Sequence, residues 1–236
     1  MTIELVTFDL DDTLWHTAPV IQSAEIVLRE WLAEHAPRLG FFAPERLHEI
    51  RQRLVTADSS LVHRISHLRR RVLFTALQEA GYAPAQAEAL ANDAFEAFLH
   101  ARHQVAFFPD AAATLETLAQ RYTLGALTNG NADVRRLGVA DYFSFALCAE
   151  DVGVGKPDPR PFEEALRRGR SQASRAVHVG DNPLDDIEGA KQAGLRAVWY
   201  NPQGLPWTGG LMPDGEIATL SELPELLASW AQPESR

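Results

Sequence analysis

Short apolar segments that alternate with helical segments constrain the fold of this chain more than any other feature. The strands expected beyond residue 107 cover residues 122–127, 145–148, 176–179 and 196–200. The helices expected around them cover residues 110–120, 161–168, 185–193 and 221–230. Short strands joined by helices of about ten residues are typical of a parallel sheet with helices on both faces. The sequence therefore predicts an α/β fold for this part of the chain.

A further strand, expected at residues 3–8, is separated from the others by a long helical block. Helical patterns fall in three stretches of that block, at residues 19–32, 61–80 and 84–101. We expect residues 1–14 and 106–236 to form one α/β core, with residues 15–105 as a helical insertion. The aromatic residues of the insertion are expected to pack in its interior: Trp31, Phe41, Phe42, Phe74, Phe95 and Phe98.

Charge and cysteine content limit the partners and the compartment. The chain has 22 basic and 32 acidic residues and a net charge of −10, which repels nucleic acid and anionic membrane surfaces. Cys148 is the only cysteine, so no intrachain disulfide forms, as is usual in a reducing cytosol. The N-terminal residues do not resemble a signal peptide, and no apolar stretch is long enough to cross a bilayer. We expect a cytoplasmic protein that binds neither nucleic acid nor membranes.

Polar residues gather where the expected strands end. Four clusters lie at these ends or in the loops beyond them: Asp9-Leu10-Asp11-Asp12-Thr13, Thr128-Asn129-Gly130, Lys156 in a loop rich in Gly and Pro, and Gly180-Asp181 followed by Asp185 and Asp186. Ligands bind at the carboxyl ends of the strands in open α/β sheets. We therefore expect the clusters to converge at one edge of the sheet.

The residue types in these clusters suit a metal ion and a phosphate. Bringing Asp9, Asp11 and Asp181 together costs several kcal/mol in repulsion and desolvation unless a cation lies among them. Carboxylate oxygens favour a hard divalent ion such as Mg²⁺. The hydroxyl of Thr128 and the ammonium of Lys156 are donors that bind phosphate oxygens and offset charge in phosphoryl transfer. A carboxylate is also an accepted phosphoryl acceptor.

Four segments resemble, in order, the four motifs of the haloacid dehalogenase-like (HAD) hydrolases: VTFDLDDTLW, ALTNGN, GVGKPDPRPF and HVGDNPLDDIEGA. The resemblance implies a modified Rossmann core with a parallel sheet, and the helical block lies where one subfamily carries a helical cap. It also implies a Mg²⁺-dependent phosphomonoesterase that forms an aspartyl phosphate and acts on a small phosphorylated metabolite. Within the family the sequence looks most similar to riboflavin-pathway phosphatases, which act on FMN and on a phosphorylated ribitylamino-uracil.

The resemblance also implies a role for each matching residue. Asp9 would be the nucleophile and a metal ligand. Asp11 would protonate the leaving alkoxide and then deprotonate the attacking water, with its main-chain carbonyl on the metal. Thr128 and Asn129 would hold the phosphoryl oxygens, and Lys156 would pair with the phosphate and with Asp9.

The last motif would complete the metal site. Asp181 matches its metal ligand, and the second acid is either Asp186 or Asp185. One departure concerns the first motif, because His16 stands at the third position after Thr13, where members of the subfamily commonly carry an acid. The contact between this segment and a cap is therefore expected to differ from that of relatives.

Basic side chains cluster in the helical insertion, at His63, Arg64, His67, Arg69, Arg70 and Arg71. One interpretation is a solvated helix face. The other is that Arg69 or Arg71 faces the catalytic site and binds polar groups of the substrate.

Three other functions use similar residues. A 2-haloacid dehalogenase of the same fold also uses the first aspartate as its nucleophile, but it needs no metal and its relatives generally lack the acid that Asp11 provides. A phosphomutase shares the phospho-enzyme chemistry and returns the phosphate to its substrate. A receiver-like phospho-acceptor module groups acids, a threonine and a lysine around Mg²⁺, but the long insertion between Asp9 and Thr128 does not fit its compact domain.

Overall fold

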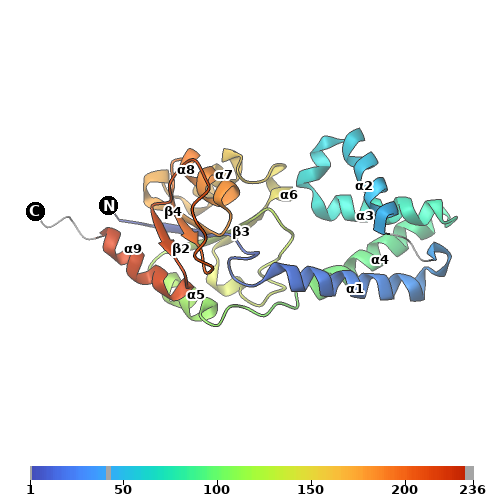
Figure 1. Ribbon diagram of the computed structural model, residues 1–236, viewed down its shortest axis with the longest axis horizontal. Coiled ribbons are helices and arrows are strands. Elements are labelled where there is room, and N and C mark those ends of the chain that lie inside the picture. Colours follow the sequence, from blue (N-terminus) through green and yellow to red (C-terminus); the bar gives the residue numbers. More distant parts are fainter. Residues whose placement is uncertain (1, 41–43, 232–236) are drawn as a thin grey trace, which may run out of the picture. The chain divides into compact units, whose positions relative to one another are not determined.

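The computed structural model describes residues 2–40 and 44–231. The chain divides into two compact units (Figure 1). One unit joins the two ends of the chain, Met1–His16 and Ala106–Arg236, and the other comprises Thr17–Val105.

The chain leaves and re-enters the first unit through a short main-chain contact. Trp15 forms an antiparallel bridge with Phe107, and the N–H of Phe108 donates to the carbonyl of Leu14 at 2.9 Å. Trp15 therefore stays with the first unit, whose boundary at His16 lies two residues beyond the expected one.

Six parallel strands form one sheet in the first unit, in the order β3-β2-β1-β4-β5-β6. The strands are β1 (Leu5–Phe8), β2 (Thr123–Thr128), β3 (Phe145–Cys148), β4 (Ala176–Gly180), β5 (Arg196–Tyr200) and β6 (Gly215–Ile217). Every residue of β1 and β4 is buried, as strands covered on both faces require. The predicted α/β fold with a parallel sheet is confirmed. Strand β6 was not predicted, because its three residues contain no apolar run.

Helices cover both faces of this sheet. They are α5 (Ala111–Ala119), α6 (Ala149–Val152), α7 (Pro159–Gly169), the π-helix η5 (Pro183–Glu188), α8 (Gly189–Gln192) and α9 (Leu223–Ala231), with 3₁₀ turns η3 (Ala140–Tyr142), η4 (Ala173–Arg175) and η6 (Leu220–Glu222). Helices α7 and α8 lie on one side of the sheet, and α5 and α9 lie on the other (Figure 1). Leu5, Phe162 and Ile187 belong to one buried apolar cluster that joins β1, α7 and η5.

The single helix expected at residues 185–193 is in fact the π-helix η5 followed by one α-helical turn, α8.

The strand order creates a switch point beside β1. From β1 the chain builds the sheet outward through β2 and β3, and it then returns to place β4, β5 and β6 on the other side. Adjacent loops diverge at such a point and leave a crevice at the carboxyl ends of the strands. The N–H of Asp9 donates to the carbonyl of Val179 at 2.9 Å, so the residues that follow β1 and β4 begin side by side.

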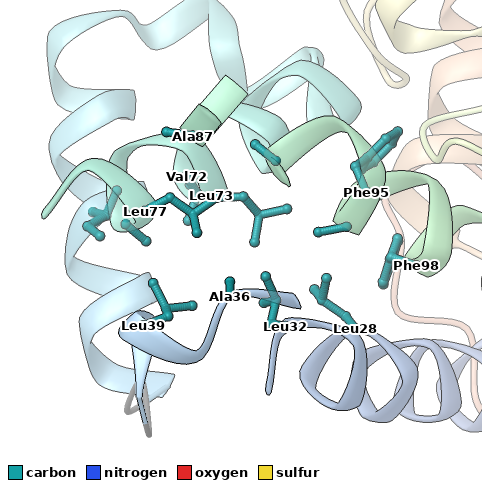
Figure 2. Close-up of a cluster of buried hydrophobic side chains, with 14 of the residues drawn as sticks. Leu28, Leu32, Ala36, Leu39, Val72, Leu73, Leu77, Ala87, Phe95 and Phe98 are labelled. Atoms are coloured by element: carbon teal, nitrogen blue, oxygen red, sulfur yellow. The ribbon is translucent and has the colours of Figure 1, made fainter. Parts of the chain in front are cut away.

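The second unit is helical throughout its described elements. They are α1 (Thr17–His35), η1 (Pro37–Leu39), α2 (Pro44–Ala57), η2 (Ser59–His63), α3 (Ile65–Glu79) and α4 (Pro84–Arg102). Leu28 and Leu32 of α1 share a buried cluster with Leu73 of α3 and with Phe95 and Phe98 of α4 (Figure 2). Apolar residues at helical spacing thus supply this unit with a core of its own.

The packing expected of Phe41 and Phe42 falls outside the described residues. Among the described parts of the whole chain, no helix is long and apolar enough to cross a membrane.

Truncation of Leu73 tests the core of the helical unit. Leu73 is 2% exposed and lies inside the cluster of Figure 2, so Leu73→Ala should lower the free energy of unfolding by about 3 kcal/mol through lost burial and a residual cavity. Val62 is 42% exposed, so Val62→Ala should change it by less than about 0.5 kcal/mol. Urea unfolding followed by circular dichroism measures both, and equal losses would contradict this assignment of the core.

Candidate active site

Three strands end in functional side chains at the same edge of the sheet. Asp9 directly follows β1, Thr128 is the last residue of β2, and Asp181 directly follows β4. Lys156 comes from the loop between α6 and α7. The convergence expected of the four polar clusters thus follows from parallel strands that end together.

Lys156 is the central cation of this site. Its side chain is 2% exposed, and its ammonium donates to Asp9 Oδ1 at 2.7 Å, to Asp186 Oδ1 at 2.6 Å and to the carbonyl of Leu127 at 2.7 Å. Burial alone would lower the pKa of Lys156, but the two carboxylates outweigh burial and raise the pKa above its usual value. The lysine is therefore a permanent positive charge shared by two acids.

A third carboxylate joins these two acids. Ligand oxygens of Asp9, Asp181 and Asp186 lie within 4.8 Å of one another, and the hydroxyl of Thr13 lies 3.4 Å from both Asp9 Oδ2 and Asp181 Oδ1. Burial and the neighbouring carboxylates raise the pKa of Asp9. Burial, with the charges of Asp186 and Asp12, raises the pKa of Asp181 to about 7. The single ammonium of Lys156 therefore does not offset the charge of all three carboxylates.

Asp185 and Asp186, the two candidates for the second acid of the last motif, differ in burial and in partners. Asp186 is buried and accepts hydrogen bonds from Lys156, from His178 and from the N–H of Asn182. Burial opposes its ionisation, but Lys156 and His178 hold the pKa of Asp186 well below its usual value. Asp185 lies on the same π-helix and is only half-buried. Single π-helical turns occur often at functional sites, and here the turn directs Asp186 to the lysine.

His178 belongs to the site although sequence analysis did not select it. It is fully buried in β4, and its Nε2 lies 3.1 Å from Asp186 Oδ1 while its Nδ1 lies 2.9 Å from the hydroxyl of Thr7. Burial lowers the pKa of His178, so we assign a neutral imidazole that donates from Nε2 and accepts from Thr7. Its ring also packs edge-on against Phe162. The sequence offered one signal for this role: His178 is a polar residue inside a strand that was expected to be buried, and a buried polar group needs a hydrogen-bond partner.

The side chain of Asn129 contacts the main chain of Lys156. Its Oδ1 accepts from the Lys156 N–H at 2.7 Å, and its Nδ2 donates to the Lys156 carbonyl at 2.8 Å and to Asp185 Oδ2 at 3.2 Å. A Cβ on Gly155 would lie 2.5 Å from that Oδ1, so glycine is needed for this close approach. The amide expected to bind a phosphate thus holds the lysine loop against the end of β2, and its contact with phosphate stays a prediction.

Asp11 and Thr128 have local partners. Asp11 Oδ1 accepts from the indole N–H of Trp15 at 3.1 Å, and the carboxylate cluster above does not include Asp11. Thr128 is buried, and its hydroxyl accepts from the N–H of Gly130 at 2.9 Å. A hydroxyl that accepts one bond keeps its own hydrogen to donate, so a phosphate contact through Thr128 stays a prediction.

Arg69 and Arg71 lie on α3 in the helical unit. Arg69 pairs with Glu25 at 2.7 Å, and its guanidinium lies 3.9 Å from the ring centroid of Phe98. Arg71 is exposed. These contacts show how Arg69 is held within its own unit, and a substrate contact by either arginine stays a prediction.

The arrangement can serve as a nucleophilic site with a place for a hard cation. Asp9 is a carboxylate whose Oδ1 is fixed by an ammonium, and Asp181 and Asp186 crowd beside it. Three carboxylates with one ammonium leave negative charge uncompensated, and an all-oxygen donor set suits Mg²⁺. The residues present therefore fit a magnesium ion.

Known proteins match the chain over most of its length. Residues 3–194 match the haloacid dehalogenase-like hydrolase family. The chain is 32% identical to the 5-amino-6-(5-phospho-D-ribitylamino)uracil phosphatase YigB of Escherichia coli, over 95% of this chain and 96% of YigB. It is 34% identical to a phosphoserine phosphatase of Thermus thermophilus, over 94% of this chain and 98% of that one. A crystal structure of 2-haloacid dehalogenase from Pseudomonas syringae has 65% identity and a TM-score of 0.96, over 98% of this chain and 100% of that one.

Removal of the Lys156 ammonium should destabilise the protein strongly. Lys156→Met leaves Asp9 and Asp186 buried without their cation, so the free energy of unfolding at pH 7 should fall by about 3–5 kcal/mol. Lys191 pairs with Asp214 at 2.8 Å and is partly exposed, so Lys191→Met should cost no more than about 1 kcal/mol. Chemical denaturation of both variants measures the difference. Similar losses in the two would show that the buried lysine is not central to the site.

Proposed function

Because the chain belongs to the haloacid dehalogenase-like hydrolase family, as its four motifs predict, we propose that it is a Mg²⁺-dependent phosphomonoester hydrolase. The observation that carries the proposal is the Asp9 carboxylate, fixed by Lys156 and crowded by Asp181 and Asp186. Two relatives that align with nearly the whole chain are phosphatases, YigB and a phosphoserine phosphatase, which supports the same reaction class.

The first step is transfer of the phosphoryl group to Asp9. A carboxylate oxygen of Asp9 attacks phosphorus, the P–O bond to the alcohol breaks, and its electron pair stays on the ester oxygen. Asp11 gives that oxygen a proton, so a neutral alcohol leaves and an aspartyl phosphate remains. Lys156 holds Asp9 Oδ1 during this step and keeps the carboxylate oriented.

The second step is hydrolysis of the aspartyl phosphate. Water attacks phosphorus, the P–O bond to Asp9 breaks, and its electron pair returns to the Asp9 carboxylate. The water gives a proton to Asp11, which restores the acid for the next turnover, and inorganic phosphate leaves. Thr128 and Asn129 are proposed to hold the phosphoryl oxygens, Thr128 through its hydroxyl and Asn129 through its main-chain N–H, because both side-chain hydrogens of Asn129 already have acceptors. The three hydrogens of Lys156 already have acceptors, so a contact between Lys156 and phosphate requires one of these bonds to be exchanged.

Magnesium would be held by the carboxylates of Asp9 and Asp181 and by the main-chain carbonyl of Asp11, with Asp186 beside them. When bound, it supplies positive charge that offsets the carboxylates and the charge on the phosphate. Asp186 is bonded to Lys156, His178 and Asn182, which suits a residue that supports the metal site without leaving the lysine.

The helical unit is proposed to be the cap that selects a small phosphorylated metabolite. Arg69 and Arg71 are its proposed contacts with substrate. The similarity to YigB makes FMN and the phosphorylated ribitylamino-uracil the first compounds to assay, and phosphoserine is the natural comparison because of the second relative.

Replacement of Asp9 tests the nucleophile. Wild-type protein should release phosphate from p-nitrophenyl phosphate with Mg²⁺, and EDTA should abolish the release. Asp9→Asn should lower kcat/KM by about a thousandfold or more because an amide does not form the acyl phosphate. Asp141 is exposed in the same unit, so Asp141→Asn is the matched control with unchanged turnover. Activity of Asp9→Asn within tenfold of wild type, in a folded protein, would refute the proposal.

A 2-haloacid dehalogenase is the second candidate, favoured by the structure from Pseudomonas syringae at 65% identity. In that reaction Asp9 would attack carbon and expel halide, and water would then hydrolyse the ester. This chemistry needs neither a metal nor an acid for the leaving group. Asp11 and the carboxylate of Asp181 are therefore the features that favour phosphate over halide.

One assay separates the two candidates. Phosphate release from p-nitrophenyl phosphate and chloride release from 2-chloropropionate should be measured on the same preparation, each with Mg²⁺ and with EDTA. We expect phosphate release that depends on Mg²⁺. Chloride release should be no higher than the background measured with the Asp9→Asn variant. Chloride release that persists in EDTA and is lost in Asp9→Asn, without phosphatase activity, would establish the dehalogenase instead.

A further inference from the structure

The indole of Trp15 contacts the carboxylate that the proposed function uses as its acid and base. Its N–H donates to Asp11 Oδ1 at 3.1 Å. The two residues are also joined through a parallel main-chain bridge. Between them Asp12 has a φ of +62°, a left-handed conformation that turns the chain back. The segment from Asp11 to Trp15 is therefore a closed turn in which the indole is hydrogen-bonded to the carboxylate.

Trp15 is held rigidly enough to orient its partner. The side chain is 0% exposed. Its ring packs edge-to-face against Phe107, with ring centroids 5.6 Å apart and an interplanar angle of 86°, and its main chain pairs with the same residue. An indole N–H buried in such a setting needs an acceptor, and Asp11 provides one.

We propose that Trp15 is a positioning residue that orients Asp11 for proton transfer, an inference that rests on the phosphatase function proposed above. An indole only donates, so the oxygen it binds acts as an acceptor whether Asp11 is charged or neutral. In a neutral carboxylic acid the carbonyl oxygen is a better acceptor than the hydroxyl oxygen, so the indole favours Oδ1 as the carbonyl oxygen and Oδ2 as the oxygen that carries the proton.

This arrangement fixes which oxygen exchanges protons. As the P–O bond to the alcohol breaks, the ester oxygen keeps the electron pair and takes the proton from Oδ2 of Asp11. In the second step the water that attacks the aspartyl phosphate returns a proton to Oδ2. Trp15 loses and gains nothing in either step, and its contribution is orientation.

The test uses leaving groups of different basicity. Protonation matters for an alkyl alcohol and matters little for p-nitrophenolate, which leaves as an anion. The value of kcat/KM reports the chemistry up to release of the alcohol, so it should be measured for glycerol 2-phosphate and for p-nitrophenyl phosphate. Trp15→Phe keeps a ring against Phe107 and removes the N–H. The ratio of kcat/KM for the alkyl ester to that for the aryl ester should fall about tenfold.

A second variant guards against a packing defect. Benzothienylalanine at position 15, inserted by codon suppression, keeps the two-ring shape of tryptophan and replaces the N–H with sulfur. It should lower the same ratio as Trp15→Phe does, and Asp11→Asn should lower it further. Circular dichroism and thermal melting establish that each variant is folded.

The outcomes separate this inference from the function beneath it. Equal losses on both esters, an unchanged ratio or a raised ratio in the benzothienylalanine variant would overturn the role of Trp15 while the phosphatase stands. Wild-type protein that hydrolyses neither ester would overturn the proposed function, and the role of Trp15 with it. A selective loss on the alkyl ester in both Trp15 variants supports the inference.

Discussion

The ammonium of Lys156 between Asp9 and Asp186 is the interaction on which the site depends. It pairs with two buried carboxylates from different parts of the chain, and it donates to the carbonyl of Leu127 in β2. A buried pair of this kind tolerates little displacement, because loss of one partner leaves an uncompensated charge. The two hydrogen bonds from the Asn129 side chain to the main chain of Lys156 limit such a displacement. The loop is fixed at its backbone so that the charge at the end of the side chain stays between the acids.

The parallel sheet brings these groups together because its strands end at the same edge. Asp9 and Asp181 follow adjacent parallel strands whose loops diverge at the switch point. The helical unit is inserted after β1, and Trp15 pairs with Phe107 where the chain departs and returns. The segment that follows Asp9 is thereby tied to the first unit before the insertion begins. For this reason the position of Asp9 does not depend on the long insertion that follows it.

Much of the fold and part of the site could be predicted from the sequence. The parallel α/β sheet could be predicted because strands buried on both faces have a clear apolar pattern, and the structure confirms it. The four motifs indicated the family to which the chain belongs. The π-helix could not be predicted, because its residues also suit an α-helix, and this left Asp185 and Asp186 equivalent. The target of the Asn129 amide depends on a contact with a loop distant in sequence. Hydrogen-bonding partners of this kind follow from tertiary packing and have no periodic signature.

The charge of the site bears on which reaction it serves. Asp9, Asp181 and Asp186 face one ammonium, and burial lowers the pKa of His178, so the imidazole adds no positive charge. A phosphate monoester brings further negative charge, and a divalent cation is the ordinary means of offsetting both. A 2-haloacid is a monoanion whose halide leaves without a proton, so its displacement would use neither Asp181 nor the acid at Asp11. Phosphate chemistry gives Asp11 and Asp181 a role, whereas dehalogenation leaves both of them without a chemical purpose.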